Sequence, residues 1–214
     1  MLMYGYFRSS AAYRVRIALN LKGLAVETLP IHLTRDGGQH LTAEYAAINP
    51  EKLVPALQDG ETLISQSLAI LEYLEERHPE PPLLPRDAAS RATVRSLAAL
   101  VACDVHPLNN LRVLKYLEKT LGVTPEQKLD WIRHWITAGF DAIETRLTRD
   151  GTSGLCCFGD LPTFADCCLI PQVFSARRFD LSLDPYPAIR RIDAHLNGIE
   201  AFAAAAPGRQ ADAE

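Results

Sequence analysis

The residue types best suited to chemistry lie at a junction between a predicted strand and a predicted helix. Ser9 and Ser10 follow the apolar run 1–7 and lead into the segment 11–22, where apolar residues recur at helical spacing. Free N–H groups and the helix dipole make such a helix N-terminus favourable for an anion. The junction therefore predicts a site for a small anion such as a thiolate. The structural alternative is that Ser9 serves only as a helix cap.

Three further pieces within the first eighty residues suit a peptide-like, anionic ligand. Pro55 begins a predicted strand, where it cannot donate to a ladder, and the pattern is compatible with a cis bond after Val54. The backbone of Val54 is then available to pair with an extended ligand, as an added strand would. Gln66 and Ser67 begin the next predicted helix, whose N-terminus suits a carboxylate. His40 follows a Gly-Gly loop. Taken singly, these features have structural alternatives: a rigid turn, a helix cap and a surface histidine.

The elements that must position these residues divide the chain in two. Strand-like and helix-like patterns alternate up to residue 77, as in a small α/β domain with a mixed sheet. Four prolines between residues 79 and 85 form a stiff connector, after which only helical patterns follow. We therefore expect an α/β domain over residues 1–82 and an all-α domain over residues 88–214. The predicted strands cover residues 1–7, 26–31, 53–57 and 62–64, and the predicted helices cover 11–22, 67–77, 88–116, 125–146, 163–179 and 187–205.

Composition argues against several classes of function. The chain of 214 residues is long enough for a real core, and its net charge of −4 gives no general reason to bind nucleic acid or an anionic membrane. No apolar run has the length of a membrane span, and no secretory signal pattern opens the sequence, so the cytoplasm is the expected location. The five cysteines match no common zinc spacing, and we expect reduced, buried thiols and no metal.

The order and spacing of these pieces resemble a known family. The α/β domain, proline connector and all-α domain are similar to the glutathione transferase fold, whose first domain is thioredoxin-like. The segment 9–19 resembles the zeta-class signature S-S-C-x-W-R-V-R-I-A-L, with Ala11 and Tyr13 in place of the family's Cys and Trp. A role for a protein thiol at that point is therefore not implied. Further segments fit the same class or its bacterial maleylpyruvate and maleylacetoacetate isomerases, at residues 36–39, 49–50, 54–55, 66–74 and 103–112.

The resemblance implies that glutathione is the cofactor and assigns residues to it. Ser9 would hydrogen-bond the sulfur, and Gln66 and Ser67 would hold the γ-glutamyl end. Val54 would pair with the cysteinyl backbone, and His40 would reach the glycyl carboxylate. The full set implied for glutathione is Ser9, Ser10, Ala11, His40, Val54, Gln66, Ser67, Asp104, His106 and Asn110, with Asp104 acting across the interface of a homodimer. The set implied for the substrate is Arg8, Arg112 and Arg178, or its neighbour Arg177.

The resemblance also implies a reaction, the isomerisation of maleylacetoacetate to fumarylacetoacetate in tyrosine and phenylalanine catabolism. A thiolate that adds to the conjugated double bond makes it single, rotation follows, and expulsion of the thiolate returns the glutathione. Arginine suits a dianionic substrate because its planar fork matches a carboxylate. The alternatives are a maleylpyruvate isomerase of the gentisate pathway, a general glutathione S-transferase, and a non-catalytic binding module on the same fold.

Overall fold

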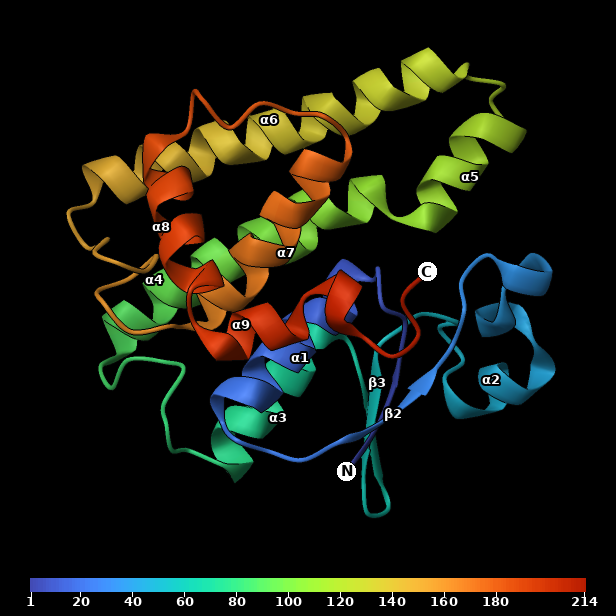
Figure 1. Ribbon diagram of the computed structural model, residues 1–214, viewed down its shortest axis with the longest axis horizontal. Coiled ribbons are helices and arrows are strands. Elements are labelled where there is room, and N and C mark those ends of the chain that lie inside the picture. The colour runs from blue at the N-terminus through green and yellow to red at the C-terminus, as the bar shows by residue number, and fades with distance from the viewer. The chain divides into compact units, whose positions relative to one another are not determined.

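The computed structural model describes residues 1–214, which form two compact units. The first unit comprises Met1–Leu83 and Gly198–Glu214, and the second comprises Leu84–Asn197. The first unit contains a sheet with helices and the second is helical, which confirms the predicted fold class (Figure 1). The expected domain boundaries, 1–82 and 88–214, stay a prediction. The structure adds that residues 198–214 pack with the first unit.

A mixed four-stranded sheet forms the centre of the first unit, with the strand order β2-β1-β3-β4. β1 (Leu2–Gly5) runs parallel to β2 (Glu27–Pro30) and antiparallel to β3 (Ala56–Asp59), and β3 is antiparallel to β4 (Thr62–Ser65). All four predicted strands are therefore present.

All four strands differ from their predicted limits by at least one residue, and the larger differences, at β1 and β3, have a local cause. β1 is shorter than the predicted run 1–7 because Tyr6 and Phe7 leave the sheet to form the turn before the first helix. β3 begins later than predicted because Pro55, which has no N–H to donate, precedes it.

Four helices accompany the sheet. α1 (Ser10–Leu21) and α3 (Ser67–Arg77) lie side by side on one side of the sheet, α2 (Ala43–Ile48) lies on the other, and α9 (Glu200–Ala205) packs along α1 (Figure 1). α1 ends as predicted at Gly23, whose φ of +65° favours glycine. The predicted loop after β2 contains two short 3₁₀ turns, Arg35–Gly37 and Gln39–Leu41.

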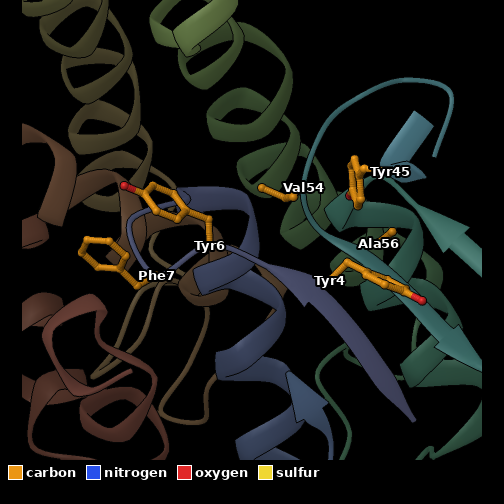
Figure 2. Close-up of a cluster of buried hydrophobic side chains, with 6 residues drawn as sticks. All are labelled: Tyr4, Tyr6, Phe7, Tyr45, Val54 and Ala56. Atoms are coloured by element: carbon orange, nitrogen blue, oxygen red, sulfur yellow. The ribbon is translucent and has the colours of Figure 1, made fainter. Parts of the chain in front are cut away.

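Six buried aromatic and aliphatic side chains form a cluster at the end of the sheet where β1 ends and β3 begins. Figure 2 shows Tyr6 and Phe7 together at one end of the cluster and Tyr4 and Tyr45 at the other. The rings of Tyr6 and Phe7 meet edge to face at a centroid distance of 4.7 Å. The Tyr45 hydroxyl donates to the carbonyl of Leu53 at 2.7 Å, so α2 fixes the chain that leads into β3.

The second unit contains α4 (Ala88–Ala99), α5 (Leu111–Lys119), α6 (Pro125–Arg149), α7 (Phe164–Arg178) and α8 (Pro187–Asn197). The prediction of one helix over residues 88–116 is wrong. After α4 the chain forms a π turn at Leu100–Val105 and a 3₁₀ turn at His106–Asn109 before α5 begins. Pro107 lacks the N–H that a continuous α-helix would need, and Asn110 starts a new helix as its cap.

The prediction of one helix over residues 187–205 is also wrong, because the chain breaks at Gly198 and Ile199 between α8 and α9. The apolar spacing continues across the break, which is why the sequence suggested one helix. The two halves bury their apolar faces in different units, α8 in the second and α9 in the first.

Lys22, at the end of α1, anchors the proline connector to the first unit. Its ammonium group donates to the Glu75 carboxylate at 2.8 Å and to the carbonyls of His78 and Pro81 at 2.7 and 3.0 Å. Glu75 also accepts the N–H of Leu83. The side chains of Lys22 and Glu75 are 0% and 7% exposed, so the ion pair is almost fully removed from water. Such a pair tolerates the loss of one partner poorly, because the other charge is left buried.

We expect Glu75→Ala to lower the free energy of unfolding by about 3–5 kcal/mol, because it strands the Lys22 ammonium. The measurement is urea denaturation followed by circular dichroism. Glu76→Ala is the matched control, since Glu76 is exposed and next in the sequence, and it should change the stability little. Equal effects of the two substitutions would contradict an anchoring role for the buried pair.

Candidate functional site

The register of the sheet brings the predicted site segments to one edge. Tyr4 lies opposite Ala56 in the β1–β3 pair, and Ala56 lies opposite Ser65 in the β3–β4 pair. Because neighbouring antiparallel strands alternate in direction, the residues after β1, before β3 and after β4 leave the sheet at the same edge. The turn at Ser9, the backbone of Val54 and the start of α3 are therefore neighbours in the fold.

The N-terminus of α1 supplies several donors. Ser9 is the N-cap, and its Oγ accepts the N–H of Ala12 at 3.2 Å, so the structural alternative of a cap holds. The cap does not use the hydroxyl proton, which stays available to an acceptor. The N–H groups of Ser10 and Ala11 have no partner in the chain, and the first turn contains no acidic side chain. This end of the helix can therefore stabilise an anion.

The N-terminus of α3 has the same character. It has no side-chain cap and no acidic residue in its first turn, and Ser67 and Leu68 begin it with unpaired N–H groups. Gln66 has φ +67° and ψ 114°, a conformation that is rare for a residue other than glycine and recurs at ligand-binding sites. Buried Arg14 donates to Ser67 Oγ at 3.1 Å and so fixes the serine hydroxyl.

Val54 presents its backbone at the same edge. The Val54–Pro55 bond is cis, as the sequence suggested. Val54 lies outside the ladder, which begins at Ala56, and neither its N–H nor its C=O pairs with another backbone group. The preceding Leu53 carbonyl is held by Tyr45 and Asn49. The two free polar groups of Val54 are therefore available to an extended ligand.

His40 lies half-buried on the second of the 3₁₀ turns after β2. Gly38 has φ +113°, and a Cβ at that position would lie 2.6 Å from His40 Cε1. Only glycine at position 38 therefore permits the observed place of the ring. The N–H of Ile31 donates to the carbonyl of Gly5 at 2.7 Å, which ties the start of this segment to the end of β1.

Arg8 is exposed and yet held in place. Its Nη2 and Nε donate to the Tyr6 hydroxyl at 2.8 and 3.2 Å, and its guanidinium carbon lies 5.0 Å from the centroid of the Phe7 ring. Both contacts use residues of the turn that joins β1 to α1. The guanidinium is therefore preorganised on the turn that precedes Ser9, and its exposed face can receive a carboxylate.

Four of the predicted residues lie between the end of α4 and the first turn of α5, in the second unit. The exposed Asp104 lies on the π turn, a feature often found at functional sites, and His106 begins the 3₁₀ turn that follows. Asn110 caps α5, because its Oδ1 accepts the N–H of Arg112 at 3.1 Å. Arg112 is exposed on the first turn of α5. The four residues therefore occupy one short stretch between α4 and α5.

The two arginines at the end of α7 differ in their contacts. Arg177 forms an ion pair with the buried carboxylate of Asp193 on α8. Arg178 is exposed, and its guanidinium carbon lies 5.1 Å from the centroid of the Phe179 ring. Arg177 is thus tied to α8, and the assignment of Arg178, or of its neighbour Arg177, to a substrate stays a prediction.

Sequence reasoning missed the residues that hold the site in place. Tyr6 orients Arg8, Arg14 fixes Ser67, and buried Arg16 donates to the Phe7 carbonyl at 3.0 Å. Glu51 accepts from Gln66 Nε2 at 2.6 Å. The sequence does contain a signal for Arg14 and Arg16, because these two cationic residues interrupt the otherwise apolar helical pattern of residues 11–22.

No group of three or more His, Cys, Asp or Glu side chains is arranged to hold a metal ion. None of the helices combines the length and the apolar character needed to cross a membrane.

Comparison with known proteins gives consistent matches over the whole chain. The family described as "Glutathione S-transferase, N-terminal domain" matches residues 3–82. The probable maleylacetoacetate isomerase of Vibrio cholerae is 50% identical, with 100% of this chain and 98% of the relative covered. A solved maleylpyruvate isomerase, described as a bacterial zeta-class glutathione S-transferase in its holo form, has a TM-score of 0.97 at 50% identity, with 100% of both chains covered.

A second solved relative carries ligands. It is the maleylacetoacetate isomerase of Methylobacterium extorquens AM1 with bound malonate and glutathione, and it has a TM-score of 0.96 at 43% identity, with 100% of both chains covered. Identity at this level over full length extends the likeness beyond the fold to the sequence itself. The chain therefore belongs to the glutathione transferase family, in the zeta class that includes the maleylacetoacetate and maleylpyruvate isomerases.

Proposed function

We propose that this protein is a glutathione-dependent cis–trans isomerase that converts maleylacetoacetate to fumarylacetoacetate in aromatic catabolism. The observation that carries the proposal is the junction of β1 and α1, where one short segment holds a preorganised arginine, a serine hydroxyl and two free N–H groups. That combination suits a thiolate next to a carboxylate substrate. The names of the relatives agree with it, from bacteria to mouse.

Maleylpyruvate is the second candidate substrate. A maleylpyruvate isomerase of a Ralstonia species is as similar in sequence as the Vibrio cholerae relative, at 50% identity. Both substrates are cis-enedioic keto acids and place the same demands on the site. They differ in the group beyond the ketone, so the depth of the substrate pocket decides between them.

Glutathione is the cofactor, and the residues of the first unit fit it. The peptide has two carboxylates, a thiol and an extended backbone, and the first unit offers two helix N-termini with free N–H groups and the unpaired backbone groups of Val54. In this assignment Ser9, Ser10 and the Ala11 N–H hold the sulfur. Gln66 and Ser67 hold the γ-glutamyl carboxylate, and His40 holds the glycyl carboxylate. Asp104, His106 and Asn110 complete the set from the second unit.

When bound, glutathione supplies a thiolate that adds reversibly to the conjugated double bond and so permits rotation about it. The protein must therefore keep the sulfur ionised near neutral pH, although a free thiol has a pKa of about 8.5. The Ser9 hydroxyl donates a hydrogen bond to the charged form, and the dipole of α1 favours the same form. Arg8, Arg112 and Arg178 bind the two carboxylates of the substrate. Their positive charge stabilises the negative charge that develops on the ketone oxygen of the substrate.

The protein's own thiols are unsuited to this chemistry. Cys156, Cys157, Cys167 and Cys168 are buried, and only Cys103 is exposed. Burial raises the pKa of Cys156 to about 12 and the pKa of Cys157 well above its ordinary value. The five thiols are all reduced, which suits a reducing compartment, and we assign the protein to the cytoplasm on that basis.

The decisive test of the proposed function follows the fate of glutathione. Isomerisation of maleylacetoacetate should require glutathione in catalytic amounts, and free thiol should be the same before and after many turnovers. The measurement is absorbance of the substrate, with thiol titration of the quenched reaction. Maleylpyruvate assayed in parallel separates the two isomerase candidates by kcat/KM. Stoichiometric loss of thiol would indicate a conjugating transferase instead.

Ser9→Ala should reduce kcat by about 10²–10³-fold, as expected when one donor to a developing or bound anion is removed. The pKa of bound glutathione, followed by thiolate absorbance, should rise at the same time. Thr124→Ala is the matched control, because it removes the hydroxyl cap of α6 without touching the proposed site. Unchanged activity of Ser9→Ala would transfer the role to Ser10 or to a backbone N–H.

Thiol accessibility checks that no protein thiol takes part. Native protein at pH 8 should react with a disulfide reagent at one thiol, Cys103, and all five should react in urea. Cys103→Ser should abolish the native reaction and leave the isomerase activity unchanged. Rapid native reaction of a second thiol would contradict the burial of the remaining cysteines.

We also assign a two-fold homodimer, the assembly that would allow Asp104 to reach the glutathione amine of the other subunit. Sedimentation equilibrium at micromolar concentration should give twice the chain mass of 23.6 kDa. A monomer that retains full activity would exclude a role for Asp104 across the interface.

A further inference from the structure

The turn that carries Arg8 is held from outside by the far end of the chain. Ser9 N–H donates to the Tyr6 carbonyl at 3.0 Å, so Phe7 and Arg8 are the two central residues of the turn. The N–H of Phe7 donates to Asp212 Oδ2 at 3.0 Å, across 205 positions of sequence. Both residues belong to the first unit, so this contact lies within one compact body.

The other polar group of the Phe7 backbone is also occupied. The Phe7 carbonyl accepts from Arg16 Nη2 at 3.0 Å, and Arg16 Nε donates to the carbonyl of Ala205 at 2.9 Å. Arg16 is 6% exposed, so these bonds are shielded from water. The Arg16 guanidinium connects the end of α9 to the turn. The carboxylate of Asp212 accepts the N–H of Phe7. The backbone of Phe7 is thus fixed by one cation and one anion.

The side chain of Arg8 depends on that backbone. Its guanidinium lies over the Phe7 ring and donates twice to the Tyr6 hydroxyl. A shift of the Phe7 peptide would move the ring on which Arg8 rests and would change the direction in which Arg8 leaves the turn. The carboxylate of Asp212 is the partner of the Phe7 N–H, and a hydrogen bond to an ionised acceptor is stronger than a neutral one.

We propose that Asp212 is a positioning residue for the isomerase reaction, acting through the Phe7 N–H to hold the Arg8 guanidinium in its substrate-binding place. The inference rests on the proposed role of Arg8 as a substrate ligand. Asp212 itself touches neither the substrate nor glutathione in this scheme.

A second acidic residue of the same C-terminal segment, Glu214, provides a control. Glu214 Oε1 lies 3.2 Å from His32 Nε2 and also forms an ion pair with Arg35. His32 Nδ1 accepts the N–H groups of Thr34 and Arg35, so the ring proton is on Nε2 and faces Glu214. Glu214 is an exposed acidic residue two positions from Asp212 that makes no contact with the Phe7 peptide.

The experiment compares Asp212→Ala, Asp212→Asn and Glu214→Gln with the parent chain. Three readouts are measured: kcat/KM of the isomerisation, the glutathione Kd by calorimetry, and hydrogen exchange of the Phe7 amide by NMR. Asp212→Ala should lower kcat/KM by roughly ten- to a hundred-fold, the size expected for one lost hydrogen bond to a charged group, while the glutathione Kd stays within about two-fold. The Phe7 amide should exchange faster.

The conservative variant separates positioning from a general effect on folding. In Asp212→Asn the side-chain carbonyl can still accept the Phe7 N–H, so this variant should keep kcat/KM within about three-fold of the parent and keep the amide protected. Glu214→Gln should leave all three readouts unchanged. Loss of activity in Asp212→Asn equal to that in Asp212→Ala, or equal loss of glutathione affinity, would overturn the inference.

A double-mutant cycle with Arg8→Ala identifies the route by which Asp212 acts. Arg8→Ala alone should reduce kcat/KM strongly, and adding Asp212→Ala to it should cause little further loss. Additive losses would overturn the inference. Parent-like activity of Asp212→Ala beside impaired Arg8→Ala would overturn it and leave the proposed function standing. Full activity of Arg8→Ala would contradict the substrate role of Arg8. It would also contradict the positioning role of Asp212, which acts through Arg8.

Discussion

The antiparallel pairing of β1 with β3 is the interaction on which the candidate site depends. It sets Tyr4 opposite Ala56 and so brings the turn at Ser9 and the backbone of Val54 to one edge of the sheet. Side chains alternate between the faces of a strand, so a shift of one residue would move Met3 and Tyr4 to the opposite faces of the sheet. Both side chains are buried, so each would have to fit the packing of the other face, and this constraint fixes the register.

α1 holds the segments of the candidate site in place, because three buried cationic side chains along it and at its end contact different partners. Arg14 reaches the start of α3, Arg16 reaches the turn after β1 and the end of α9, and Lys22 reaches the proline connector. Each buried charge is costly to strand, so each contact fixes a separate segment relative to α1. One helix thus carries free N–H groups at its N-terminus, where we propose that an anion binds, and the anchors for the surrounding segments along its length.

The departures of this chain from its class are compatible with the same chemistry. Ala11 removes the family's cysteine, yet position 11 contributes its backbone N–H to the free donors of α1, and that group is independent of the side chain. Tyr13 is almost fully buried, so the change from Trp alters packing beneath the site and not its exposed donors. The chemistry proposed for this turn needs only the hydroxyl of Ser9, the backbone and Arg8.

The sequence by itself determined the four strands and their order, the helix that begins after Ser9 and the resemblance to the family, because these depend on neighbouring residues and on local backbone chemistry. The tertiary structure decided what long-range contacts control. The apolar spacing over 187–205 could not reveal a break at Gly198, since both halves are amphipathic and only packing assigns them to different units. The sequence pattern also could not pair Asp212 with Phe7, because a hydrogen bond between residues 205 positions apart leaves no local pattern.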